Sequence, residues 1–121
     1  MRAAAARFGP ALAVMVALFA LSSVPGSNAP SAVPDKLAHL AVYAVLGYAM
    51  QRAFHGNARP PRTAIVALAA LAAVLYGITD EYHQTFVEGR TASLADLGFD
   101  ALGAVLGTLA YAVRHRRTVK R

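Results

Sequence analysis

The chain has 121 residues, of which 57% are hydrophobic and only 15% are charged, and its mean hydropathy is +0.45. This balance excludes an ordinary soluble domain and is typical of a membrane protein, while the absence of cysteine excludes disulfides and thiolate metal sites. The net charge of +6 lies in short basic segments between apolar runs rather than along one helix face, so no nucleic-acid partner is predicted.

Four apolar segments predict helices that cross a lipid bilayer, at about residues 8–24, 36–54, 62–84 and 94–113. No segment has the alternating pattern of a β-strand. The predicted fold class is therefore all-α, a four-span transmembrane helical bundle whose surroundings are the lipid bilayer. The sequence does not determine the oligomeric state.

The first segment has a second interpretation, because a basic start, an apolar middle and small residues before Ala29 are also typical of a cleaved signal peptide. Pro30 directly after the candidate cleavage site, and the length of the apolar part, argue against cleavage. We therefore predict three parts. These are a first span with its outer loop (1–30), a helical membrane domain (31–113) and a basic cytoplasmic tail (114–121).

Local signals mark the other helix ends. Pro34 and Asp35 suit the first turn of the second helix, and the turn-rich linker at residues 55–62 ends it. Ser93 to Asp96 reads SLAD, a variant of the capping box. In it the Ser93 side chain accepts hydrogen bonds from the unpaired backbone N–H groups at the start of the last helix.

The basic residues predict the orientation. Ten of the twelve lysines and arginines flank one side of the four spans, and only Lys36 and Arg90 fall on the other. The positive-inside bias therefore places both termini in the cytoplasm. The ten are Arg2, Arg7, Arg52, Arg59, Arg62, Arg114, Arg116, Arg117, Lys120 and Arg121.

All six acids fall at the opposite, outer end of the predicted helices. They are Asp35, Asp80, Glu81, Glu88, Asp96 and Asp100. An aspartate at the centre of a membrane helix costs on the order of 2.5–3.5 kcal/mol on insertion scales, so the deeper acids need partners or water. An ionisable cluster at a membrane face is by default a candidate functional site.

Helical spacing predicts where these acids point. Asp96, Asp100, Gly103 and Gly107 share one stripe of the last helix, and the two glycines form a GxxxG pair that lets another backbone approach. We therefore expect this stripe to face the bundle. The second helix offers Asp35, His39 and Tyr43 at four-residue steps. The third helix offers Ala69, Ala73, Tyr76, Asp80 and His83 on one side. Three helices are thus predicted to bring polar faces to one outer pocket.

Three segments carry a resemblance: DKLAHLAVYAVLG (35–47), TDEYHQTFVEGRTASLADL (79–97) and DALGAVLG (100–107). They resemble the VanZ-like family of bacterial membrane proteins over about residues 35–110. Asp100 departs from the pattern, since the family usually has Asn there. The positions that match the family's pattern are Asp35, Lys36, His39, Tyr43, Asp80, Glu81, Gln84, Arg90, Ser93, Asp96, Gly103 and Gly107. The predicted binding residues are the first ten of these together with Asp100.

The resemblance implies a multi-pass protein of the bacterial inner (cytoplasmic) membrane, linked to the cell envelope. The family's namesake is associated with resistance to the glycopeptide teicoplanin, and the resemblance implies no established reaction. Our leading hypothesis is an outward-facing polar pocket that recognises a lipid head group, a lipid-linked envelope precursor or a glycopeptide-related ligand. Whether the protein is an enzyme stays open.

The alternative is a membrane enzyme in which Asp80, Glu81 and His39 act as acid and base in hydrolysis or transfer on a lipid-linked substrate, with Lys36 and Arg90 steadying a phosphate. A structural interpretation is also open, in which Asp80 and Glu81 pair with Lys36 and Arg90 only to hold the bundle together. Four short spans make transport the weaker option.

A metal site is conceivable from residue types alone. His39, His83, Asp80 and Glu81 are possible ligands of a divalent ion, but their spacing lacks a pattern such as HExxH. We therefore assign no metal ligand and no cofactor. The simpler expectation is that His39 and His83 form hydrogen bonds between helices.

Overall fold

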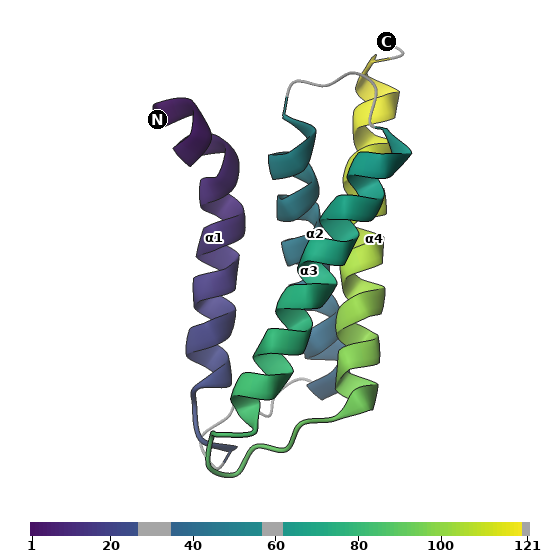
Figure 1. Cartoon of the computed structure of the whole chain (residues 1–121). Helices are drawn as coiled ribbons and strands as arrows, with labels where there is room; N and C mark the ends of the chain where they lie inside the picture. The colour runs from purple at the N-terminus through teal and green to yellow at the C-terminus, as the bar shows by residue number, and fades with distance from the viewer. Residues whose placement is uncertain (27–34, 57–61, 120–121) are drawn as a thin grey trace.

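The computed structural model is an antiparallel arrangement of four helices, and it describes residues 1–26, 35–56 and 62–119. The helices are α1 (Arg2–Ser22), α2 (Asp35–His55), α3 (Thr63–Gln84) and α4 (Leu94–Val119). Helix α1 begins and helix α4 ends at the same end of the molecule (Figure 1). No strand occurs in these described ranges, so the all-α prediction is confirmed.

Three of the helices are long and apolar enough to cross a membrane: Arg2–Ser22, Thr63–Gln84 and Leu94–Arg117. Helix α2 is not among these described helices, and its sequence includes the polar residues His39, Gln51 and Arg52. The apolar outer faces of the other helices remain exposed, with large side chains such as those of Leu71 and Leu106 about half accessible. Such a surface suits contact with lipid.

Helices α2 and α4 make the closest contact in the bundle, and glycine is the reason. A Cβ atom on Gly107 would overlap the carbonyl oxygen of Ala44, and one on Gly103 would overlap that of Leu40. The two backbones therefore touch, as the GxxxG pair predicted. Gly47 makes the reciprocal contact from α2, where a Cβ atom would overlap the carbonyl of Ala104.

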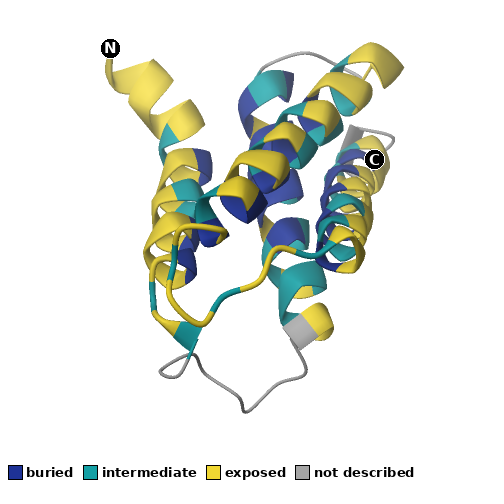
Figure 2. Ribbon diagram, turned by 60° about the horizontal axis from the view of Figure 1, so that its bottom comes forward, coloured by how far each residue is buried: buried dark blue, intermediate teal, exposed yellow. Residues whose placement is uncertain are grey.

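Helix α3 completes the core, and α1 packs beside it. Ala69 and Ala73 of α3 are fully buried against Tyr43 and Leu46 of α2. Helix α1 is mostly exposed (Figure 2), but the Tyr76 hydroxyl of α3 donates a 2.5 Å hydrogen bond to one of its carbonyls. The bundle thus has a tight three-helix centre with α1 on its flank.

Candidate functional site

Four carboxyl groups are buried where α2 begins, α3 ends and α4 begins. Asp80, Glu81, Asp96 and Asp100 are each 8% exposed or less. We call these four side chains, with His39, the acidic cluster. It lies at the end of the bundle opposite the two chain termini, as the helix directions in Figure 1 show. A buried carboxylate is costly without partners, so the partners of each group decide what the cluster can do.

Asp80 is fully paired with neutral hydroxyl groups from two other helices. Its Oδ1 accepts a 2.5 Å hydrogen bond from the Ser22 hydroxyl of α1. Its Oδ2 accepts a 3.1 Å bond from the Tyr43 hydroxyl of α2. Asp80 therefore joins α1, α2 and α3, and its oxygens point to these helices rather than to a ligand.

Asp100 and His39 form a short polar contact between α4 and α2. The His39 Nδ1 lies 2.7 Å from Asp100 Oδ1, while Asp100 Oδ2 has no hydrogen-bond partner among the described residues. Gly77 of α3 lies close to that oxygen, because a Cβ atom there would be 3.5 Å from it, in van der Waals contact. The carboxylate holds the imidazole in place, which is the arrangement expected for a histidine that acts as a base or a ligand.

Glu81 links α3 to the start of α4. Its Oε2 accepts a hydrogen bond of 3.2 Å from the backbone N–H of Ser93, and the Ser93 hydroxyl in turn accepts one of 3.3 Å from the Asp96 N–H. Ser93 is thus the cap that SLAD predicted, but Glu81 rather than the Asp96 side chain completes it. Glu81 Oε1 is buried without a hydrogen-bond partner in the described chain and lies 4.0 Å from His39 Nδ1.

The cations expected to neutralise these acids lie elsewhere. Arg90 donates from Nε to the Val24 carbonyl at 3.0 Å and from Nη2 to the Leu21 carbonyl at 3.2 Å. It therefore supplies hydrogen bonds to carbonyl groups at and just beyond the end of α1. Lys36 is exposed. Within the described ranges, no lysine or arginine forms an ion pair with the acidic cluster. The structural alternative, in which Asp80 and Glu81 pair with Lys36 and Arg90, finds no ion pair among the described residues, because Arg90 is engaged at the end of α1.

A cavity of about 190 Å³ lies beside the cluster. Four predicted binding residues line it, namely His39, Gln84, Arg90 and Asp96. Gly26, Gly89 and Thr91 complete the lining. A 2.9 Å hydrogen bond from the Gly26 N–H to the Glu88 carbonyl joins the segment after α1 to the loop between α3 and α4. Gly26 and Thr91 were not among the predicted residues, because neither belongs to a helical pattern.

The other predicted residues divide into three groups. Glu81 and Asp100 contact His39 behind the cavity, whereas Tyr43 and Asp80 pair with each other and Ser93 caps α4. Lys36 is turned to the surface. The side chain of Asp35, and Pro34 before it, lie outside the described residues. Ser22, which donates a hydrogen bond to Asp80, was not predicted. It ends an apolar run, so helical periodicity gives no sign of its role.

Both histidines make polar contacts with other parts of the bundle, in line with the simpler expectation of hydrogen bonds between helices. His39 bonds across to α4, and His83 Nε2 lies 2.9 Å from the Ser23 hydroxyl just beyond α1. The His83 ring also stacks on Phe19 of α1, with ring centres 4.5 Å apart. His83 thus belongs to the contact between α1 and α3 rather than to the acidic cluster.

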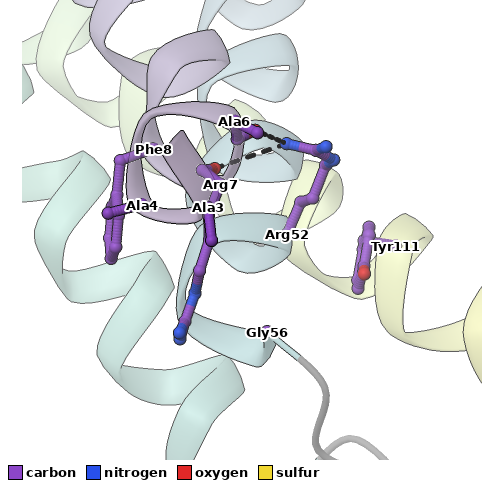
Figure 3. A pocket seen from close by; sticks show the side chains of 8 residues that line it. All are labelled: Ala3, Ala4, Ala6, Arg7, Phe8, Arg52, Gly56 and Tyr111. Carbon is purple, nitrogen blue, oxygen red and sulfur yellow. Dashed lines mark hydrogen bonds between the residues drawn. The ribbon is translucent and has the colours of Figure 1, made fainter. Parts of the chain in front are cut away.

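A second cavity, of about 530 Å³, lies at the opposite end between α1, α2 and α4 (Figure 3). Arg52 reaches across it and donates from Nη1 to the Ala6 and Arg7 carbonyls at 3.0 and 3.3 Å. Arg7 donates to the carbonyls of Ala53 and Phe54. These guanidinium groups tie α1 to α2 at the basic end, where no binding residue was predicted.

Comparison with known proteins gave one result. A family model described as VanZ/LLP1 matches residues 10–115, which includes all four helices in large part. Searches of curated proteins and of solved structures found no match.

Proposed function

Because this chain belongs to the VanZ/LLP1 family and has several helices of membrane-spanning character, we propose that it is a multi-pass envelope protein that recognises the polar part of a membrane ligand. The ligand class is a lipid head group or a lipid-linked envelope precursor. The observation that carries the proposal is the cavity lined by His39, Gln84, Arg90 and Asp96 at one end of the bundle. Concave sites with a few convergent polar groups are the usual form of ligand sites.

The topology supports access from the outer leaflet. We propose that all four helices cross the inner membrane and that both termini are cytoplasmic. The basic residues at one end and the buried acids at the other agree with this orientation. In it, the cavity opens at the level of the outer head groups, where lipid and lipid-linked precursors present their hydroxyl, amine and phosphate groups.

The lining selects polar rather than apolar ligands. The Gln84 amide and the Arg90 guanidinium provide donors, while Asp96 provides an acceptor. A glycopeptide-related ligand offers the same groups, so a contribution to teicoplanin resistance forms part of the proposal.

An enzymatic role is the second candidate, and the contact between His39 and Asp100 favours it. An imidazole held by a carboxylate at the edge of a cavity has the arrangement of a general base. In this version Glu81, with one free oxygen, is the second acid–base group. Asp80 suits that role less well than Glu81, since each of its oxygens already accepts a hydrogen bond.

The binding proposal is tested by lipid retention. The protein is purified in mild detergent from bacterial membranes, and bound lipid is measured by native mass spectrometry. Gln84→Ala should lose the retained lipid while the helical content stays unchanged. Leu71→Ala, on the exposed apolar face of α3, is the matched control and should retain it. Equal retention by both variants would contradict the proposal, and product formation from a lipid-linked phosphate would favour the enzyme.

A further inference from the structure

We propose that the acidic cluster binds one divalent metal ion through His39, Glu81 and Asp96. These residues come from α2, α3 and α4, and one ligand atom from each lies within 4.8 Å of the other two. The site goes beyond ligand recognition in the cavity, because it requires only the ion. It also differs from the sequence expectation, which considered Asp80 and His83 and omitted Asp96.

The free oxygen of Glu81 is the first argument. Oε2 is engaged by the Ser93 N–H, but Oε1 is buried and has no hydrogen-bond partner among the described residues. Its distance of 4.0 Å from His39 Nδ1 is too long for a hydrogen bond. Because Asp100 holds Nδ1 of His39, the ion would be bound through Nε2 of that ring. The unpaired oxygen is therefore where an ion would find a ligand.

The charge of the cluster is the second argument. His39 contacts the carboxyl groups of Asp100 and Glu81, and within the described ranges no lysine or arginine pairs with any of the four buried acids. Hydroxyl groups satisfy Asp80, but Asp100 retains one unpartnered oxygen behind His39. A divalent cation between the helices would neutralise this excess, as buried acids require.

Asp100 has a positioning role in this arrangement. Its carboxylate lies 2.7 Å from His39 Nδ1 and fixes the ring from α4. Carboxylates in this position commonly orient metal-bound histidines.

The donor set indicates the class of ion. One imidazole nitrogen and two carboxylate oxygens suit Zn²⁺ or Mn²⁺ better than Mg²⁺, which prefers oxygen and water ligands only. Three protein ligands leave a coordination position open. Since His39 and Asp96 also line the 190 Å³ cavity, that position faces a space where water or a phosphate oxygen fits.

The test measures ion binding directly. The full chain is purified in detergent, stripped with a chelator, and titrated calorimetrically with Zn²⁺ and with Mn²⁺ in the absence of added lipid. We expect one ion per chain. Asp96→Asn should weaken binding by at least about tenfold. It should leave the fold unchanged, because the hydrogen bond of Asp96 to the Ser93 cap comes from its backbone N–H.

His83→Ala is the matched control, since this histidine lies at the same end of the bundle but contacts Ser23 and Phe19. It should bind the ion as the unchanged protein does. The absence of stoichiometric binding by the unchanged protein would overturn the site, as would equal affinities for Asp96→Asn and His83→Ala. Gln84→Ala separates this result from ligand recognition, because it should lose the lipid and keep the ion.

Discussion

At the scale of single residues, the polar interior is held by hydroxyl and amide donors rather than by cations. Asp80 shows this most clearly, because Ser22 and Tyr43 each provide one hydroxyl to it. In a lipid-surrounded bundle these donors cannot be replaced freely by water. Each contributes more to the folded state than an exposed hydrogen bond does, since its loss leaves a buried oxygen unpaired.

Tyr43→Phe should therefore destabilise the protein by about 1–3 kcal/mol, the usual cost of an unpaired buried acceptor. The ring still fills its buried position, so the loss reports the hydroxyl alone. Unfolding in detergent, followed by circular dichroism, measures the change. Tyr82→Phe removes a hydroxyl from a side chain that is 68% exposed and should have no effect. Equal midpoints for the two variants would show that the bond to Asp80 adds little.

The partners of single residues were the hardest features to predict. Helical spacing correctly placed Asp96 and Asp100 on an inward stripe, because both lie on one regular helix. It could not predict that Arg90 would bond to carbonyls of α1, or that Glu81 would complete the Ser93 cap. Those contacts depend on how separate helices dock, which no local pattern encodes.

At the scale of the helices, the seam between α2 and α4 depends on small residues. The apolar runs predicted all four helices to within a few residues, except that α1 and α4 extend further at the basic end. Gly103 and Gly107 were predicted to face a neighbour, and they do. Gly47 was missed because a single glycine in an apolar run has many explanations.

Gly107→Leu should separate α2 from α4 and prevent stable folding. The added side chain would have to enter the backbone of Ala44, and overpacking of this kind typically costs 1–3 kcal/mol or more. Folded yield after detergent extraction and size-exclusion chromatography provides the measurement. Gly98→Leu is the control, since a Cβ atom at Gly98 meets nothing within 4 Å. A normal yield of the Gly107 variant would contradict the close packing described for this seam.

At the scale of the whole molecule, charge is separated along the bundle. The buried acids occupy one end, while Arg7, Arg52 and Arg114 lie toward the other. This separation agrees with the proposed orientation, in which the acidic end is outside. The positions of the loops in the sequence predicted the direction of each helix. Helix α2 is too polar to count among the described helices that could cross a membrane by hydropathy.

Single cysteines test this orientation cleanly, because the chain contains none. Ala92→Cys and Thr63→Cys both place a thiol at an exposed position, one at each end of the bundle. In spheroplasts, whose inner membrane is intact, a membrane-impermeant maleimide should label Cys at position 92. The thiol at position 63 should react only after lysis. The reverse pattern would invert the orientation, and labelling of both positions would contradict a spanning bundle.

The hydrogen bonds that hold the end of α1 have a consequence for biosynthesis. Ser22 meets Asp80, which is 58 residues further along the chain, and Leu21 meets Arg90, which is 69 residues further along. A nascent chain therefore exposes the end of its first helix to lipid and translocation machinery until most of the polypeptide has been synthesised. Chains that stall before residue 90 would lack the Arg90 guanidinium that binds the end of α1. In such chains α1 would not be packed against the bundle and would be accessible to quality-control proteases.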